Sequence, residues 1–313
     1  MTRLAPLALA AYILIRGCDA SVLKWLQERG VATALRTGGG EDPISLCNVF
    51  FFATLLSGLV LAVADRRRLE RELPKLGPGD LGLLGARAGL GFLVGPSAYF
   101  LALQHLSVVS QTLLFTLILP VTALLAHAWL AEPLPPRFGL TLLLLPGGLA
   151  ISRSMAGAAQ PGADLDPRGL VWALVAVAAF AGAGVLNRLV ARRSWGLGLT
   201  LGLTNLAAAL VFGSLALALF GPDHFLHMRL WWLVGVLVVY SGVINLGGDL
   251  ALLASYRGLG AIAVALWGNA AVLVALASAH WLLGEAIGAR TLVGAALILV
   301  ALLVSRRWGS SAG

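Results

Sequence analysis

The chain has 313 residues, of which 59% are hydrophobic and only 12% are charged. A water-soluble domain of this length needs far more charge to cover its surface, so the composition excludes that class. The formal net charge of +8 would suggest a nucleic-acid partner in a soluble protein. Here the arginines gather at the ends of apolar segments, which membrane topology explains, and we expect no nucleic-acid partner.

Ten apolar segments are each long enough to cross a lipid bilayer as a helix, which takes about 20 residues. They lie at about 5–25, 45–64, 81–103, 107–130, 138–155, 169–190, 197–220, 231–256, 260–283 and 290–305. The sequence therefore predicts an all-α membrane protein with ten transmembrane helices. The stretch 27–41, with three consecutive glycines, is predicted to be a long external loop.

The last third of the chain repeats a stretch from its middle at an offset of 153 positions. When residues 102–153 are laid over residues 255–306, identical residues coincide, among them His127 with His280 and Glu132 with Glu285. Each block consists of two apolar runs joined by a short charged turn. In a membrane chain, such an internal repeat indicates a transporter built from two related halves around a central site.

The halves are residues 1–155 and 169–313, and the loop-like stretch 156–168 is the linker between them. Each half holds five predicted helices. Because five is odd, the second half enters the membrane from the opposite side, so we predict two inverted five-helix repeats around a central cavity.

The largest basic cluster lies between the second and third predicted helices and consists of Arg66, Arg67, Arg68, Arg71 and Lys75. The positive-inside rule predicts that this loop is cytoplasmic. With ten helices, both termini are then also cytoplasmic. We expect a multi-pass protein of the inner (cell) membrane, in which the lipid bilayer is the main partner of the surface.

The repeated blocks resemble the two EamA domains of the drug/metabolite transporter superfamily. In each block the turn acid, Glu132 or Glu285, is followed by a helix that carries a glycine, Gly139 or Gly294. The first helix departs from the family pattern, with Arg16-Gly17 where Trp-Gly is usual. The resemblance implies ten helices, alternating access, and a central cavity lined mainly by helices one, three, four, six, eight and nine.

Charged side chains inside apolar segments are candidates for the functional site, because burying them in hydrocarbon is expensive. Arg16 and Asp19 lie three residues apart, on one face of the first helix. They form either a neutralising pair held for structure or a charge clamp for substrate. In the second case Asp19 is also the candidate acid for proton coupling.

Arg87 in the third helix and Asp249 in the eighth are at similar predicted depth, roughly 10 Å from the cytoplasmic surface at 1.5 Å per residue. These two helices are counterparts in the two halves. A pair between Arg87 and Asp249 is therefore predicted to form a cytoplasmic gate. The alternative is that each finds another partner or extends separately toward the membrane surface.

Polar residues near the middle of the fourth and ninth helices are candidates for the cavity lining: Thr112, Thr116, Trp267 and Asn269. Hydrogen bonding between helices is the alternative for them, and it is the expectation for Asn205 and Asn245. His127 and His280 are predicted to pack near helix ends. Glycine pairs in the third and seventh helices, Gly85/Gly89, Gly91/Gly95 and Gly198/Gly202, predict close approaches of neighbouring helices.

No HExxH, GxSxG, GKS/GKT or CxxC motif occurs, so we expect no enzyme, metal or cofactor. The sequence predicts a secondary transporter, an exporter of small organic solutes such as amino acids, metabolites or drugs, acting as a monomer or homodimer. A gradient, with proton coupling as one option, would supply the energy. The alternatives are a non-transporting membrane scaffold and an intramembrane enzyme. Substrate identity, transport direction and coupling ion are left open by the sequence.

Overall fold

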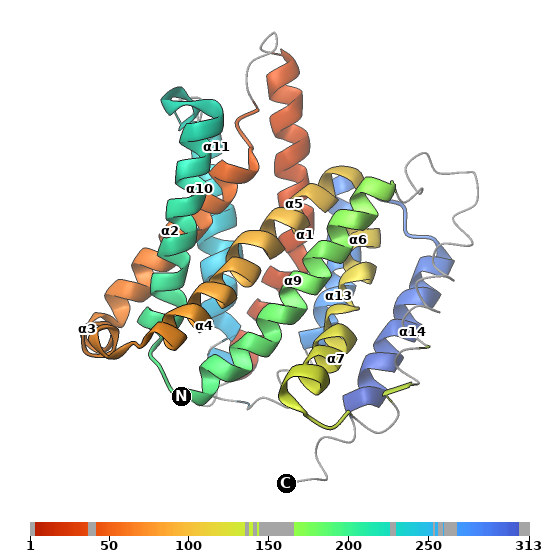
Figure 1. The fold of residues 1–313 in the computed structure, drawn as a ribbon. Coiled ribbons are helices and arrows are strands. Elements are labelled where there is room, and N and C mark those ends of the chain that lie inside the picture. The colour runs from red at the N-terminus through yellow and green to blue at the C-terminus, as the bar shows by residue number, and fades with distance from the viewer. Residues whose placement is uncertain are drawn as a thin grey trace.

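A computed structural model provides the structure of the chain. It describes residues 4–36, 42–134, 138–139, 143, 166–225, 230–252, 254–255, 259 and 268–306. Within this part of the chain the regular elements are helices, and no strand occurs there. Figure 1 shows a helical bundle in which α1 (Ala5–Arg36) begins, and α14 (Ala289–Arg306) ends, at the end where α3 (Arg66–Glu72) lies. We call this the basic end. The predicted all-α class is confirmed.

Four helical spans make up the described part of the first half. They are α1; α2 (Leu46–Ala64); α4 (Pro78–Ala88) with η3 (Gly89–Val94) and α5 (Gly95–His105); and α6 (Val108–Phe115) with α7 (Ile118–Leu130). The turn η2 (Leu73–Lys75) follows α3. Serines start two of these helices, because the hydroxyls of Ser45 and Ser107 accept the backbone N–H three residues further on.

The second half begins with α9 (Pro167–Arg192), whose first residue is a proline and whose N-cap is Asp166. The elements that follow are η4 (Gly198–Leu203), α10 (Thr204–Phe220), η5 (Pro222–Phe225), α11 (Leu230–Leu233), η6 (Val234–Gly247), η7 (Gly268–Ala270), α13 (Ala271–Leu283) and α14. The elements η3, η4 and η6 have π-helical hydrogen bonding. Such irregular turns are frequent at functional sites.

Seven of the described helices are long and apolar enough to cross a membrane. They are Ala5–Arg36, Leu46–Ala64, Pro78–His105, Val108–Leu130, Pro167–Arg192, Gly198–Phe220 and Trp231–Leu252. The helix Ala271–Leu283 is apolar but shorter. Most of the predicted helix at 138–155, and the first part of the one at 260–283, fall outside the described residues, so the number of ten rests on the sequence.

The predicted external loop at 27–41 is wrong over most of its length, because α1 continues to Arg36. Residues in this extension stabilise the helix locally. The guanidinium of Arg29 lies over the Trp25 ring, 5.6 Å from its centroid. The hydroxyl of Thr33 donates to the carbonyl of Arg29 at 2.8 Å. These contacts accompany the continuation of the helix past the polar and charged residues at 27–29 to Arg36.

The repeat is visible in the local structure of two helix ends. The residues after α7 and α13, Ala131 and Gly284, both adopt the left-handed conformation, with φ of 52° and 69°. In each turn a histidine Nδ1 pairs with the carbonyl oxygen of the turn glutamate, five residues on, at 2.7 Å for His127 and 3.0 Å for His280. The two histidines therefore fix helix ends, in line with the prediction.

These two turns lie at opposite ends of the bundle. The start of α9 is next to the end of α5, where His105 and Asp166 pair at 2.9 Å. The Glu285 carboxylate is at that same end, because it accepts the backbone N–H of Val108 at 2.7 Å. Glu132 pairs instead with arginines at the far end of α9, Arg188 and Arg192. Opposite placement is what an inverted repeat requires.

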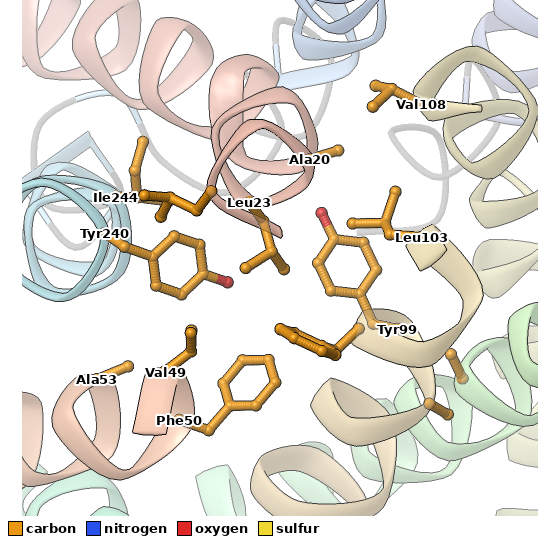
Figure 2. Close-up of a cluster of buried hydrophobic side chains, with 14 of the residues drawn as sticks. Ala20, Leu23, Val49, Phe50, Ala53, Tyr99, Leu103, Val108, Tyr240 and Ile244 are labelled. Carbon is orange, nitrogen blue, oxygen red and sulfur yellow. The ribbon is translucent and has the colours of Figure 1, made fainter. Parts of the chain in front are cut away.

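A densely packed core joins helices of both halves inside the bundle. Figure 2 shows part of it, with Leu23 of α1, Phe50 of α2 and Leu103 of α5 converging. The helices α1 and α13 approach especially closely, because a Cβ atom at Gly17 would lie 2.4 Å from the Cβ of Val274. Glycine is therefore required at position 17 to hold the two halves together along these helices.

Two of the three predicted glycine pairs also mark close approaches of helices. A Cβ atom at Gly95 would lie 2.8 Å from the Phe180 ring, and one at Gly202 would lie 2.8 Å from the backbone of Ala62. The prediction of a close approach at Gly85/Gly89 was wrong, since added Cβ atoms there would meet nothing within 4 Å. Spacing alone does not say which face of a helix meets a neighbour.

Candidate functional site

A cavity of about 550 Å³ lies at the centre of the bundle. Helices of both halves line it: α1, α2, η3 with α5, and α6 with α7 from the first, and α9, α10, η6 and α13 from the second. The six helices implied by the family resemblance all contribute, and α2 and α10 add to them. Its charged lining residues are Arg16, Asp19 and Asp249.

Arg16 connects the two carboxylates. Its guanidinium lies 3.3 Å from the Asp19 carboxylate in the same helix and 3.6 Å from the Asp249 carboxylate in the second half. The side chains of Arg16 and Asp249 retain about a third of their exposure, and Asp19 retains 18%. One guanidinium therefore faces two carboxylates at the edge of the cavity. Both interpretations made from the sequence, a structural pair and a charge clamp for substrate, are compatible with this geometry. Arg16 and Asp19 form a pair, and the pair also borders the cavity.

Two acceptor atoms in the lining have no donor among the described residues. They are Oδ1 of Asp19 and Oε1 of Gln111, both buried. Gln111 is 1% exposed, and its amide nitrogen donates to the Tyr99 carbonyl at 3.4 Å. A buried acceptor without a donor costs free energy, which a ligand with suitable donors would recover.

Aromatic rings form much of the remaining wall. The Tyr99 and Phe115 rings are 5.3 Å apart between centroids, and Phe115 and Phe180 are 6.0 Å apart. Figure 2 shows the hydroxyl groups of Tyr99 and Tyr240 pointing toward the same space beside α1. All four of these aromatic residues line the cavity. Their positions carry no functional signal in the sequence, because aromatic residues in apolar helices also occur in ordinary packing.

Arg87 is placed differently from its prediction. It is 8% exposed and does not appear in the cavity lining. Its guanidinium donates to the side chain of Asn187 and to the backbone carbonyl of Thr200, and it lies 5.2 Å from the centroid of the Phe92 ring. The predicted pair with Asp249 is not formed in this structure, because both residues are held by other partners.

The polar candidates of the fourth helix do line the cavity. Thr112 and Thr116 are both part of it, and the Thr116 hydroxyl donates to the carbonyl of Leu113 at 2.6 Å. Trp267 lies outside the described residues. Asn269 lies in η7 at the start of the α13 stretch, and its side chain is not described.

The two asparagines expected to join helices differ from each other. Asn245 of η6 donates to the Ser57 hydroxyl of α2 at 3.1 Å, as expected for a residue that connects helices. Asn205 donates within its own stretch, to the carbonyl of Leu201 at 2.9 Å. Both also line the cavity.

Polar groups of α1 hold α5 above the cavity, on the side away from the basic end. The Lys24 ammonium donates to the carbonyl oxygens of Leu103 and Leu106 at 2.8 and 2.6 Å, where α5 ends. Gln27 donates to the Phe100 carbonyl at 3.0 Å. A cation at the last carbonyls of a helix is favoured by the helix dipole. Lys24 was not predicted as a functional residue, because a lysine at the end of an apolar segment is typical of an ordinary helix end.

Among the residues that the structure describes, no group of three His, Cys, Asp or Glu side chains is arranged to hold a metal ion. Cys18 is half-buried and Cys47 is buried, and both are free thiols. The chemistry of this site is therefore that of charged and polar groups around an aromatic cavity within apolar spans.

Comparisons with known proteins agree with this architecture. Residues 167–307 match the EamA-like transporter family. A protein of Synechocystis sp. named uncharacterized transporter sll1164 is 26% identical over 317 residues, which cover 96% of this chain and 86% of that protein. A crystal structure described only as that of a protein is similar over 98% of this chain and 99% of that chain, with 20% identity and a TM-score of 0.49. That last likeness is too low to bear on function.

The helices and the cavity define a multi-pass membrane protein. Residues 167–307 match the EamA-like transporter family, and a transporter-named relative matches almost the whole chain, so the resemblance inferred from the sequence is confirmed.

Proposed function

We propose that the protein is a secondary transporter that exports small organic solutes, such as amino acids, metabolites or drugs, across the inner membrane by alternating access. The observation that carries this proposal is the central cavity, where Arg16, Asp19 and Asp249 meet between the two halves. Charged groups inside apolar spans are costly and mark the path of a substrate or ion. A cavity of about 550 Å³ has room for a solute of this size.

The packing on one side of the cavity supports alternating access. On the side away from the basic end, Lys24 and Gln27 hold α5 against α1 over a dense core. A transporter needs a second state in which these contacts separate and the other side closes. The inverted halves, 1–155 and 169–313 with the linker 156–168, would exchange these roles. In this proposal both termini are cytoplasmic.

The energy source in this proposal is an ion or solute gradient, because the sequence contains no nucleotide-binding loop. Asp19 is the proposed coupling acid. Its carboxylate borders the cavity and shares Arg16 with Asp249, so a change in its protonation would alter the ion pair between the halves.

The test is a thermal-shift screen of the purified protein against metabolites, followed by uptake of each stabilising solute into proteoliposomes. A ligand that binds the native state raises its stability. The variant Thr112→Trp, which places an indole in the cavity, should lose both effects. A folded protein that moves none of the solutes that stabilise it would be a scaffold. Chemical conversion of a bound solute would indicate an intramembrane enzyme.

A further inference from the structure

The unpaired atoms of the cavity indicate which chemical groups it accepts. Asp19 Oδ1 and Gln111 Oε1 are both acceptors, whereas no nitrogen is among the buried side-chain atoms that lack a partner in the described residues. The cavity therefore has spare acceptors and needs donors. A carboxylate ligand has only acceptors, whereas an ammonium group has three donors and no acceptor.

Arg16 cannot easily serve a carboxylate ligand. Its guanidinium already faces the carboxylates of Asp19 and Asp249. A ligand carboxylate would have to displace one of them and would leave three negative groups around one cation. Like charges held together without compensation are strongly unfavourable in a partly desolvated site. This argues against acids and also disfavours zwitterions as ligands.

Aromatic residues complete a cation site. Tyr99 and Tyr240 both lie near the Asp19 carboxylate, with the Tyr240 hydroxyl in hydrogen-bonding range of it, and Phe115 and Phe180 continue the wall. Aromatic faces attract cations and also accept apolar groups. Arg87 adds a positive charge behind Phe92, but neutral acceptors hold it outside the lining. The position of the spare acceptors, and not the net charge of the region, identifies the ligand.

We propose that the cavity binds organic ammonium compounds, with the ammonium group on Asp19 and Gln111 and an apolar or aromatic body against Tyr99 and Phe115. This names the substrate class of the proposed transporter and rests on that function. Asp19 and Gln111 act here as specificity-determining residues. Asp249 holds Arg16 away from the ammonium group.

The test measures binding of four probes that share a phenyl group to the purified full chain by calorimetry. They are 2-phenylethylamine, the neutral 2-phenylethanol, the anion 3-phenylpropanoate and the zwitterion phenylalanine. The amine should bind at least about tenfold more tightly than the other three, the difference expected for a charge-assisted hydrogen bond. Equal or tighter binding of the alcohol, acid or zwitterion would overturn the proposal. So would a folded protein that binds none of the four.

Variants then locate the amine. Asp19→Asn should weaken 2-phenylethylamine binding by about tenfold or more and leave 2-phenylethanol unchanged. Gln111→Leu should weaken the amine to a smaller extent. Asp223→Asn is the matched control, because Asp223 is exposed in η5 and not part of the cavity lining. If Asp19→Asn does not fold, the probe series and Gln111→Leu still decide the question.

Transport assays separate this proposal from the proposed function. If proteoliposomes take up only neutral or zwitterionic solutes, and Asp19→Asn does not change that uptake, the ammonium proposal fails while the transporter stands. If an amine binds but no solute is transported, the proposed transport function is wrong, whereas the proposed ammonium-binding site is supported.

Discussion

The guanidinium of Arg16 in α1 lies 3.6 Å from the carboxylate of Asp249, which follows η6 in the second half. This ion pair spans the two halves of the protein beside the central cavity. Because Asp19 binds the same guanidinium at 3.3 Å, one cation holds an acid from each half. Any rearrangement that separates the halves at this depth has to break or exchange one of these pairs.

The first prediction concerns this pair. Arg16→Asp and Asp249→Arg should each abolish uptake, because each leaves buried charges of one sign together. The charge-swapped double variant restores one guanidinium and two carboxylates, so it should recover part of the uptake. The measurement is proteoliposome uptake of a solute that the wild type transports. Losses that add without any recovery would mean that the two residues act independently.

A matched double variant distinguishes this pair from the pair predicted from the sequence. Arg87→Asp combined with Asp249→Arg should recover nothing, because the Arg87 position is surrounded by Asn187 and the Thr200 carbonyl. An aspartate there would lie against acceptors. Recovery by this second swap would restore the predicted cytoplasmic gate as a state that the protein visits.

Arg87 itself is expected to act on stability. Arg87→Ala leaves Asn187 and the Thr200 carbonyl without their charged donor, which should cost about 1–3 kcal/mol and lower the melting temperature. Arg193→Ala is the control, since Arg193 is exposed and pairs with Asp80 at 3.4 Å. A surface pair of this kind contributes about 0–1 kcal/mol. Equal effects of the two variants would contradict the anchoring role of Arg87.

The repeat-related glutamates should differ in their effect on stability. Glu285 accepts the backbone N–H groups of Val108 and Val109 at 2.7 and 3.0 Å, so it caps the start of α6. Glu285→Ala should therefore cost about 1 kcal/mol or more, as losing a helix cap does. Glu132 pairs with Arg188 and Arg192, which are largely exposed, so Glu132→Ala should cost less. Melting temperatures of the two variants check this order.

The sequence predicted those residues of the site that can be recognised by the cost of burying a charge in the membrane. Arg16, Asp19 and Asp249 are charges inside apolar segments, and all three line the cavity. It predicted the pair between Arg16 and Asp19 but not the pair between Arg16 and Asp249. Depth along a helix follows from residue number, but the direction of a side chain depends on how the helix is rotated against its neighbours. For this reason Arg87 and Asp249, predicted at similar depth, have different partners in the structure.

The helix boundaries could likewise be predicted only where the length of an apolar segment sets them. Segments set by hydrophobic length, such as α2 and α9, matched the sequence closely. The outer part of α1 did not, because Gln27, Glu28 and Arg29 interrupt the apolar pattern although local contacts such as that between Arg29 and Trp25 continue the helix to Arg36. The internal repeat could be recognised in the sequence because both copies contain the same turn. In each copy the residue after the helix, Ala131 or Gly284, adopts the left-handed conformation.

Topology gives a further prediction. In a variant without Cys18 and Cys47, Asp223→Cys should react with an impermeant thiol reagent from outside the cell and Arg67→Cys should not. Arg67 is at the basic end, where the positive-inside rule places the cytoplasm. Cysteines at Gly39 and Gly162, which lie outside the described residues, should behave like Asp223→Cys. Reaction of Arg67→Cys together with Asp223→Cys in intact cells would contradict the orientation.

The last prediction concerns pH and the segment between α1 and α2. Burial raises the pKa of Asp42 above its ordinary value, although the backbone N–H of Ile44 and the nearby His224 oppose this shift. The folded state therefore holds the Asp42 proton to higher pH than the unfolded state does. Stability from this group is present below its ordinary pKa and is lost as pH rises through the folded-state pKa.

Asp42→Asn removes this dependence and keeps a side-chain oxygen that can accept the Ile44 N–H, now at 2.8 Å. The variant should be more stable than the wild type at neutral pH. The difference should disappear as the pH falls below about 4, where the unfolded-state carboxyl also becomes protonated. Melting curves of both proteins across this range provide the measurement. A variant less stable than the wild type at neutral pH would show that the charged hydrogen bond to Ile44 outweighs the cost of burying the carboxylate.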